Sequence, residues 1–298
     1  MCFTPPRFIT RNQTFGAFAS SVPTRPLLGA LQTGVLWDHR QQIEISFMSG
    51  SSTRQQRKKT RKIFRKIFRY TNLDLRWVKN GCGHVRITFH DDIPSQSHLG
   101  TQCLSVPKDL WTINLKSIQP DTECPSPLEE RTIRHECMHL LAFVHEHQVP
   151  EWPNHFLFDQ SKLDEVYGGE LGMSEEEIEV NITNLSPPEM LENYSPFDPK
   201  SITLYHFPSH VMQSGVGTLY NTDLSDVDKA VLVLNYARLN PGPLVPTWTV
   251  SHAADIIGIK GQWRENIVAA THPHDVRKLY SQWSASSERS QQGGTRKA

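Results

Sequence analysis

Two histidines and a glutamate, closely spaced near the middle of the sequence, could bind and use a metal ion. His135 and His139 are four residues apart, and Glu136 directly follows the first. Side chains four apart on a helix stand on the same face, so both imidazoles can reach one ion. Catalytic zinc takes three protein ligands and keeps one position open. Glu136 would lie near a water at that position and take its proton as the water attacks a peptide carbonyl.

The third ligand is best supplied by His145. It lies ten residues after His135, so it can join the pair only if the helix breaks near Ala142 and the chain folds back. Three other donors were weighed against it, namely His147, Glu165 and Glu170. The spacing of His147 matches no zinc-binding pattern that we can justify, and the two glutamates are unnecessary once His145 binds. We therefore predict one catalytic Zn²⁺.

The helix that must carry the histidines has a marked beginning and two distinct faces. Ser126 is placed as an N-cap, Pro127 as the first helical residue, and Glu129 completes a capping box. The helix then runs into the His135–Ala142 segment. The residues nearly opposite the histidines are apolar: Ile133, Cys137, Leu140, Leu141 and Val144. One face can therefore be buried in a core while the other faces a zinc cleft, and Cys137 belongs to the core.

The segments before this helix predict a sheet. Alternating apolar residues predict strands at Gln41–Phe47, Leu73–Val78, His84–His90, Leu99–Val106 and Trp111–Leu115. Ser51–Tyr70 is expected to be a helix, with Ile63, Phe64, Ile67 and Phe68 on one stripe. The order β-α-β-β-β indicates an α+β fold, a twisted mixed sheet with helices on one face.

The segments after the zinc-binding run are rich in turns and short helices. Helices are expected at Ser161–Tyr167, Ser174–Asn184, Ser225–Ala237, Thr249–Ile257 and His274–Trp283. We predict four parts: a disordered N-terminal extension at 1–37, a metallopeptidase domain at 38–238, a small helical extension at 239–283, and a disordered tail at 284–298.

Composition limits the class of protein and its partners. Lys plus Arg (31) equals Asp plus Glu (31), so net charge predicts no acidic partner. Arg54–Arg69 holds nine basic residues, but its apolar stripe favours a solvated helix face over a nucleic-acid site. We expect a peptide or protein substrate and neither nucleic acid nor membrane; no oligomeric state is predicted.

Targeting signals and cysteines bear on the compartment. The N-terminus lacks a secretory signal, no apolar run is long enough to span a membrane, and five cysteines form no disulfide pattern. An intracellular, cytoplasmic location is favoured. Cys2 could act as a latency switch, but a single N-terminal cysteine is weak support.

The segment from His135 to Glu146, HECMHLLAFVHE, resembles the HExxHxxGxxHE signature of astacin-type metzincins. Ser97–Thr101 and Trp111–Leu115 are similar to the family's edge strand and the next strand, and Ser201–Tyr205 to its Met-turn. The likeness runs from Trp37 to Ala237. It implies a metzincin-like (zincin) endopeptidase with an irregular helical lower subdomain.

The resemblance also implies further roles at the site. Tyr205 would ligate zinc or stabilise the oxyanion, and substrate would pair with the edge strand near Leu99–Leu104. Two residues depart from the family pattern. Ala142 replaces the turn glycine, where a left-handed conformation costs alanine on the order of 1 kcal/mol. Thr203 replaces the methionine, and its hydroxyl needs a partner. The alternative function is a poorly catalytic zinc-binding relative that acts as a peptide-binding module.

Overall fold

The fold is known here from a computed structural model that describes residues 31–32, 34–148, 156–170, 173–185, 191–193, 195–239 and 248–286. The predicted N-terminal extension falls mostly outside these residues, as do Cys2 and most of the predicted C-terminal tail. The division into four parts stays a prediction.

A five-stranded sheet forms one layer of the molecule, in the order β3-β2-β4-β6-β5. Its strands are β2 (Gln42–Phe47), β3 (Asp74–Trp77), β4 (Val85–Thr88), β5 (Gln96–Ser97) and β6 (Ile113–Asn114). Four of them run parallel, and β5 joins β6 antiparallel at one edge. All four β4 residues are buried, as expected for a central strand of a parallel sheet. The predicted mixed sheet is confirmed.

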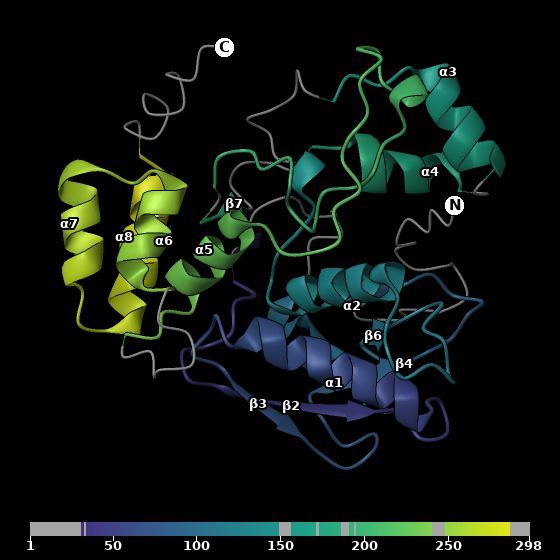
Figure 1. The fold of residues 1–298 in the computed structure, drawn as a ribbon, viewed down its shortest axis with the longest axis horizontal. Coiled ribbons are helices and arrows are strands. Elements are labelled where there is room, and N and C mark those ends of the chain that lie inside the picture. The colour runs from purple at the N-terminus through teal and green to yellow at the C-terminus, as the bar shows by residue number, and fades with distance from the viewer. Residues whose placement is uncertain are drawn as a thin grey trace.

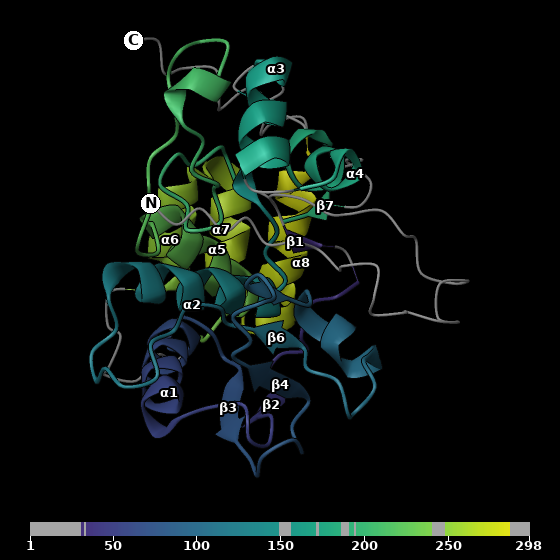
Figure 2. The same cartoon turned by 90° about the vertical axis from the view of Figure 1, so that its right-hand side faces the viewer.

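Two helices lie side by side next to the sheet (Figures 1 and 2). Helix α1 (Arg54–Phe68) is held by a Thr53 capping box, and its predicted apolar stripe is buried. Helix α2 (Pro127–Leu140) carries the zinc-binding sequence. In both views α2 lies between the sheet layer and the short helices α3 and α4.

The predicted strand Leu99–Val106 is wrong. Gly100–Ser105 instead forms a 3₁₀ helix, η1. Gly100 adopts a left-handed conformation (φ 44°), and Thr101 N donates to the Val35 carbonyl at 2.8 Å. A Cβ on Gly100 would meet that same carbonyl oxygen at 1.9 Å, so this turn requires glycine. The edge strand is therefore β5, a few residues earlier.

The part beyond α2 is built from short elements. These are η2 (Glu146–Gln148), α3 (Gln160–Leu163) continued by η3 (Asp164–Glu170), α4 (Glu175–Ile178) continued by η4 (Glu179–Thr183), and η6 (Ser209–Val211). A second, two-stranded sheet pairs β1 (Leu31–Gln32) with β7 (Leu191–Glu192). The irregular helical lower region expected from the sequence is confirmed.

Four helices at the C-terminal end form a separate layer (Figure 1): α5 (Asp226–Asn235), α6 (Val250–Ile257), α7 (Gly261–Ala269) and α8 (Pro273–Ser284). The sequence predicted all but α7. Their buried residues belong to the same hydrophobic cluster as the sheet and α2, including Tyr280 and Trp283 of α8. These helices are thus part of the main core.

The described residues also bear on cysteines and membranes. Cys82, Cys103, Cys124 and Cys137 are all free, and Cys137 is buried in the core as predicted. Within the described ranges, no helix has both the length and the apolar character needed to cross a membrane.

Candidate metal centre

The beginning of α2 is fixed by its capping box and by a buried ion pair. Ser126 caps the helix, and Pro127 and Glu129 occupy the predicted positions. Glu129 Oε1 also accepts from Lys59 Nζ of α1 at 2.6 Å, and both side chains are almost completely buried. Burial opposes the charge on Glu129, but the bond from Lys59 and those from backbone N–H groups keep its pKa lowered. This pair joins the two helices.

The end of α2 is where the chain must turn back toward the histidines. Ala142 adopts φ 71°, so alanine accepts the left-handed conformation that the family gives to glycine. Helix carbonyls freed at this end have partners from distant segments: Trp37 Nε1 donates to Leu140 O at 2.8 Å, and Tyr236 Oη to Leu141 O at 3.1 Å. The predicted break near Ala142 is confirmed.

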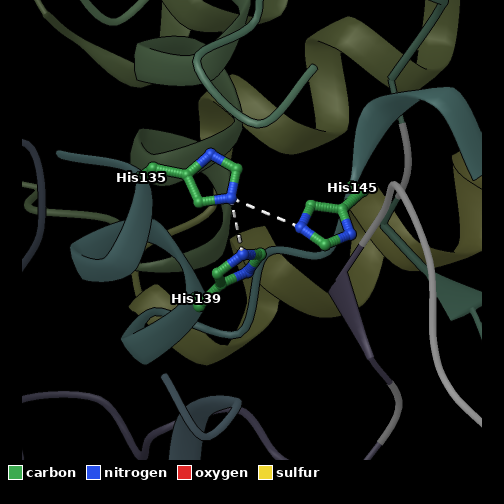
Figure 3. A group of neighbouring side chains, drawn as sticks. All are labelled: His135, His139 and His145. Atoms are coloured by element: carbon green, nitrogen blue, oxygen red, sulfur yellow. Dashed lines mark hydrogen bonds between the residues drawn. The ribbon is translucent and has the colours of Figure 1, made fainter. Parts of the chain in front are cut away.

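The turn brings the third histidine to the other two (Figure 3). The Nε2 atom of His135 lies 3.0 Å from that of His139 and 3.3 Å from that of His145. Two nitrogens bound to one tetrahedral zinc at about 2.1 Å would lie about 3.4 Å apart. All three rings are buried, and these three residues could hold a metal ion.

The contact made by the outer nitrogen of each imidazole, Nδ1, determines which of the two ring nitrogens carries the proton. His135 Nδ1 lies 3.0 Å from Ile202 O, His139 Nδ1 2.7 Å from Phe143 O, and His145 Nδ1 3.3 Å from Gln148 Oε1. These oxygens can only accept, so each Nδ1 carries the proton and each Nε2 presents a lone pair. Three lone pairs converging at this distance repel one another unless a cation lies between them. The donor set therefore fits zinc.

Electrostatics favour the neutral rings that a metal requires. Burial lowers the pKa of His139 to about 4. Burial, together with the neighbouring histidines, lowers the pKa of His135 and His145 well below their ordinary value. The metal therefore need not displace protons at neutral pH.

The polar atoms beside the imidazoles that have no hydrogen-bond partner among the described residues include Glu136 Oε2 and Tyr205 Oη. Burial raises the pKa of Glu136 well above its ordinary value, while Arg131 opposes that rise. Tyr205 lies with its ring centroid 4.3 Å from that of His145. Orphaned buried groups of this kind need an explanation, and a substrate or solvent molecule at the site would supply their partner.

Comparison with known proteins finds solved structures with a similar fold. No family model and no curated protein matches the chain. Two solved structures of myroilysin are similar: one at TM-score 0.65 and 28% identity, over 70% of this chain and 99% of that one, the other at 0.52 and 28%, over 69% and 87%. High choriolytic enzyme 1, a hatching enzyme zinc-protease from Oryzias latipes, aligns at TM-score 0.44 and 15% identity, over 68% of this chain and 94% of that one.

The chain has the fold and the three-histidine group of an astacin-like metzincin. The fold shared with myroilysin and the three converging histidines both carry this assignment.

The loop that resembles the metzincin Met-turn lies directly beneath the first histidine. Its Ile202 carbonyl is the acceptor of His135 Nδ1, and Tyr205 at its end faces the imidazoles. Thr203, which stands in place of the family methionine, has its hydroxyl 2.9 Å from Ser201 Oγ. The partner that the sequence required for this hydroxyl is therefore present.

Two of the competing donors, His147 and Glu165, lie outside the group of described residues that could hold the metal. His147 Nε2 lies 3.1 Å from Asn181 O, and its ring packs against Tyr205. Glu165 is exposed and pairs with Lys162 at 2.7 Å. Glu170 is the last residue of η3. Glu146, next to the third histidine, is buried and accepts from Asp198 N at 2.8 Å.

Sequence reasoning missed two residues at the site. Arg131, one turn before His135, donates to Leu204 O at 3.3 Å and lies over the ring of Tyr220. Its position on the zinc-bearing helix could have suggested it. Asp228 of α5 accepts from Ser201 Oγ and Ile202 N. In the sequence, a Ser225/Asp228 capping pattern predicts the start of this helix, but the contact of Asp228 with the loop depends on how the chain folds.

Proposed function

We propose that this astacin-like metzincin is a zinc-dependent metalloendopeptidase that hydrolyses peptide or protein substrates. One observation carries the proposal: three imidazole lone pairs converge beside a buried glutamate and a buried tyrosine, both with an unpartnered oxygen. A purely structural zinc site is closed by four protein ligands and has no use for these two groups. Their presence supports catalysis.

His135, His139 and His145 would hold the metal. Zinc bound in this way lowers the pKa of a water molecule to about 7 and polarises a carbonyl. The carbonyl acceptors of His135 and His139 and the Gln148 amide of His145 keep the rings oriented, which is the part of the site that the protein must supply.

Glu136 would act as the general base. It directly follows the first histidine. Its buried Oε2 has no hydrogen-bond partner among the described residues, so a purely structural role does not explain it. Burial raises the pKa of Glu136 well above its ordinary value, which makes the carboxylate a stronger base, and Arg131 opposes that rise. The base would take a proton from the attacking water and deliver it to the departing amine.

Tyr205 would donate a hydrogen bond to the developing oxyanion. Its hydroxyl is buried and unpaired among the described residues, and burial raises its pKa well above the ordinary value. The hydroxyl therefore keeps its proton at neutral pH, as a donor must. A single such donor is worth about 10²–10³ in turnover.

The substrate would pair with β5 as an additional strand. This strand forms the edge of the five-stranded sheet and contacts α2. Edge strands bind extended peptides through backbone hydrogen bonds. The proposed pairing segment thus moves from Leu99–Leu104 to Gln96–Ser97, because the former is helical.

The alternative of a poorly catalytic binding module rested on Ala142 and Thr203. Ala142 forms the turn, and the Thr203 hydroxyl is satisfied, so neither replacement speaks against catalysis.

The deciding experiment is hydrolysis of a denatured protein, followed with and without a chelator. We expect cleavage that stops when zinc is removed and returns when zinc is added back. Purified protein that holds about one zinc per chain but cleaves no substrate would favour the binding module. Protein that binds no zinc would contradict both functions.

A further inference from the structure

Asp228 links α5 to the loop beneath the imidazoles. Its side chain is buried, and Oδ1 accepts from Ser201 Oγ at 2.8 Å. Its other oxygen, Oδ2, accepts from Ile202 N at 2.9 Å and Ser225 N at 3.0 Å. The carboxylate therefore does more than cap its own helix: it holds two consecutive residues of the loop.

Ser201 passes this interaction on. Its single hydroxyl proton goes to Asp228, so its oxygen is left to accept. Thr203 N lies 3.2 Å from that oxygen and Thr203 Oγ1 lies 2.9 Å from it. The threonine hydroxyl must therefore be the donor, and Ser201 Oγ receives two hydrogen bonds from one residue.

The peptide unit between Ile202 and Thr203 completes the connection. Its N–H donates to Ser201 Oγ, and its carbonyl is the acceptor of His135 Nδ1 at 3.0 Å. Hydrogen bonds in series polarise one another, so a carboxylate at one end strengthens the carbonyl at the other. A stronger acceptor on Nδ1 makes the opposite nitrogen of a metal-binding histidine more basic.

We infer that the chain of hydrogen bonds from Asp228 through Ser201 to the Ile202 carbonyl positions His135 and raises its basicity as a metal ligand. Thr203 is a positioning residue in this chain. Its hydroxyl fixes the Ser201 oxygen in the acceptor role, which a methionine at this position cannot do. The inference rests on the proposed zinc-binding role of His135.

The test measures zinc affinity by competition with a chromophoric chelator, using the full chain. We expect Ser201→Ala to weaken zinc binding about 10–100-fold, the usual loss when a group behind a metal ligand is removed. Thr203→Val keeps the shape and removes only the hydroxyl, and it should weaken binding by at least about threefold. Combining Ser201→Ala with Asp228→Asn should cost less than the sum of the two single losses, because both interrupt one chain.

Thr60→Val is the matched control. Thr60 is a buried threonine of α1 whose hydroxyl donates to Gln56 O at 2.9 Å, remote from the imidazoles in sequence and contacts. This variant should bind zinc as the wild type does. In proton NMR of the zinc-bound protein, the Nδ1–H resonance of His135 should move upfield in Thr203→Val, while that of His139, bonded to Phe143 O, stays in place.

Wild-type affinity and an unmoved His135 resonance in Thr203→Val would overturn the inference, as would equal losses in Thr60→Val. Should Ser201→Ala fail to fold, Thr203→Val decides. These outcomes are separate from failure of the proposed function, which would show as a wild-type protein that binds no zinc.

Discussion

Glu136 and Tyr205 each depend on a hydrogen-bond partner from outside the described part of the chain. Each has a buried oxygen without a partner in the described part of the chain, and leaving such a group unpaired costs on the order of 1–3 kcal/mol. Stored cost of this kind concentrates where a ligand or substrate later supplies the missing bond. The two residues therefore allow separate tests of proton transfer and oxyanion binding.

Substituting Glu136 by Gln should abolish turnover and spare the metal. The amide cannot take a proton, and general acid–base help is typically worth about 10²–10⁴-fold. Peptide hydrolysis and zinc content, measured on the same preparation, check this. Glu130→Gln on the same helix is the control, because that side chain pairs with Arg134 away from the imidazoles. A Glu136→Gln enzyme with normal turnover, or one without zinc, contradicts the role of general base.

Replacing Tyr205 by Phe should lower kcat by about 10²-fold or more, with zinc affinity nearly unchanged. The ring still packs against His145, and only the donor is lost. Tyr70→Phe, in a tyrosine that packs edge-on against Trp248, provides the comparison. If both variants turn over substrate equally fast, Tyr205 has no catalytic part.

Among the secondary-structure elements, α1 and α2 depend on one another through Lys59 and Glu129. Replacing Lys59 by Met leaves Glu129 charged and buried, which should cost about 3–5 kcal/mol in the free energy of unfolding. Urea denaturation measures this. Lys58→Met, one residue earlier, breaks only the exposed pair with Glu123 and should cost about 0–1 kcal/mol. Similar losses in both variants would mean that the buried pair does not join the helices.

Local signals in the sequence were enough to place most elements. Capping boxes at Ser126 and Ser225 mark helix starts, and apolar spacing gives the sheet strands and the buried stripe of α1. The zinc-binding residues were found because their spacing is itself local. The third ligand needed one further assumption, that Ala142 turns the chain.

The elements and contacts that were not predicted depend on parts of the chain that are distant in sequence. Leu99–Val106 alternates as a strand would, but Gly100 packs against the Val35 carbonyl and turns the segment into η1. The strand pair β1 and β7 joins segments about 160 residues apart, which no local pattern indicates. The sequence indicates the capping role of Asp228, which is local, but not its contact with Ser201, which joins distant segments.

For the molecule as a whole, α8 holds the N-terminal part of the core to the C-terminal part. Arg277 donates to Asn235 O at 2.7 Å and to Trp37 O at 2.9 Å, and its guanidinium lies over the ring of Tyr236. We predict that Arg277→Met lowers the free energy of unfolding by about 2–4 kcal/mol, since bonds to charged groups are worth about 1.5–3 kcal/mol each.

The prediction for Arg277→Met can be checked by thermal unfolding, which also reports whether the protein unfolds cooperatively. Thermal unfolding of Arg277→Met should remain a single transition at a lower temperature, because α8 shares the hydrophobic cluster of the sheet. Lys278→Met is the adjacent control. Two separate transitions in the wild-type protein would contradict a shared core.

Stability should also fall with acidification through His39. Burial and Arg277 lower the pKa of His39 to about 4 from its ordinary 6.5. Between these values the unfolded chain binds the proton and the folded one does not, so stability decreases as pH falls from about 6.5 to about 4. His39→Gln should flatten this part of the profile by on the order of 1 kcal/mol, after allowance for solvent screening. An unchanged pH profile of urea midpoints would contradict this.

The end of α2 has a consequence for how the protein is made. Leu140 O is held by Trp37, Leu141 O by Tyr236, and Trp37 is in turn held by Arg277, 240 residues further along the chain. A ribosome releases Arg277 long after it has released the histidines of α2. The turn that delivers His145 can therefore be secured only after Arg277 has emerged, so zinc should be acquired after that point and not while α2 is the newest part of the chain.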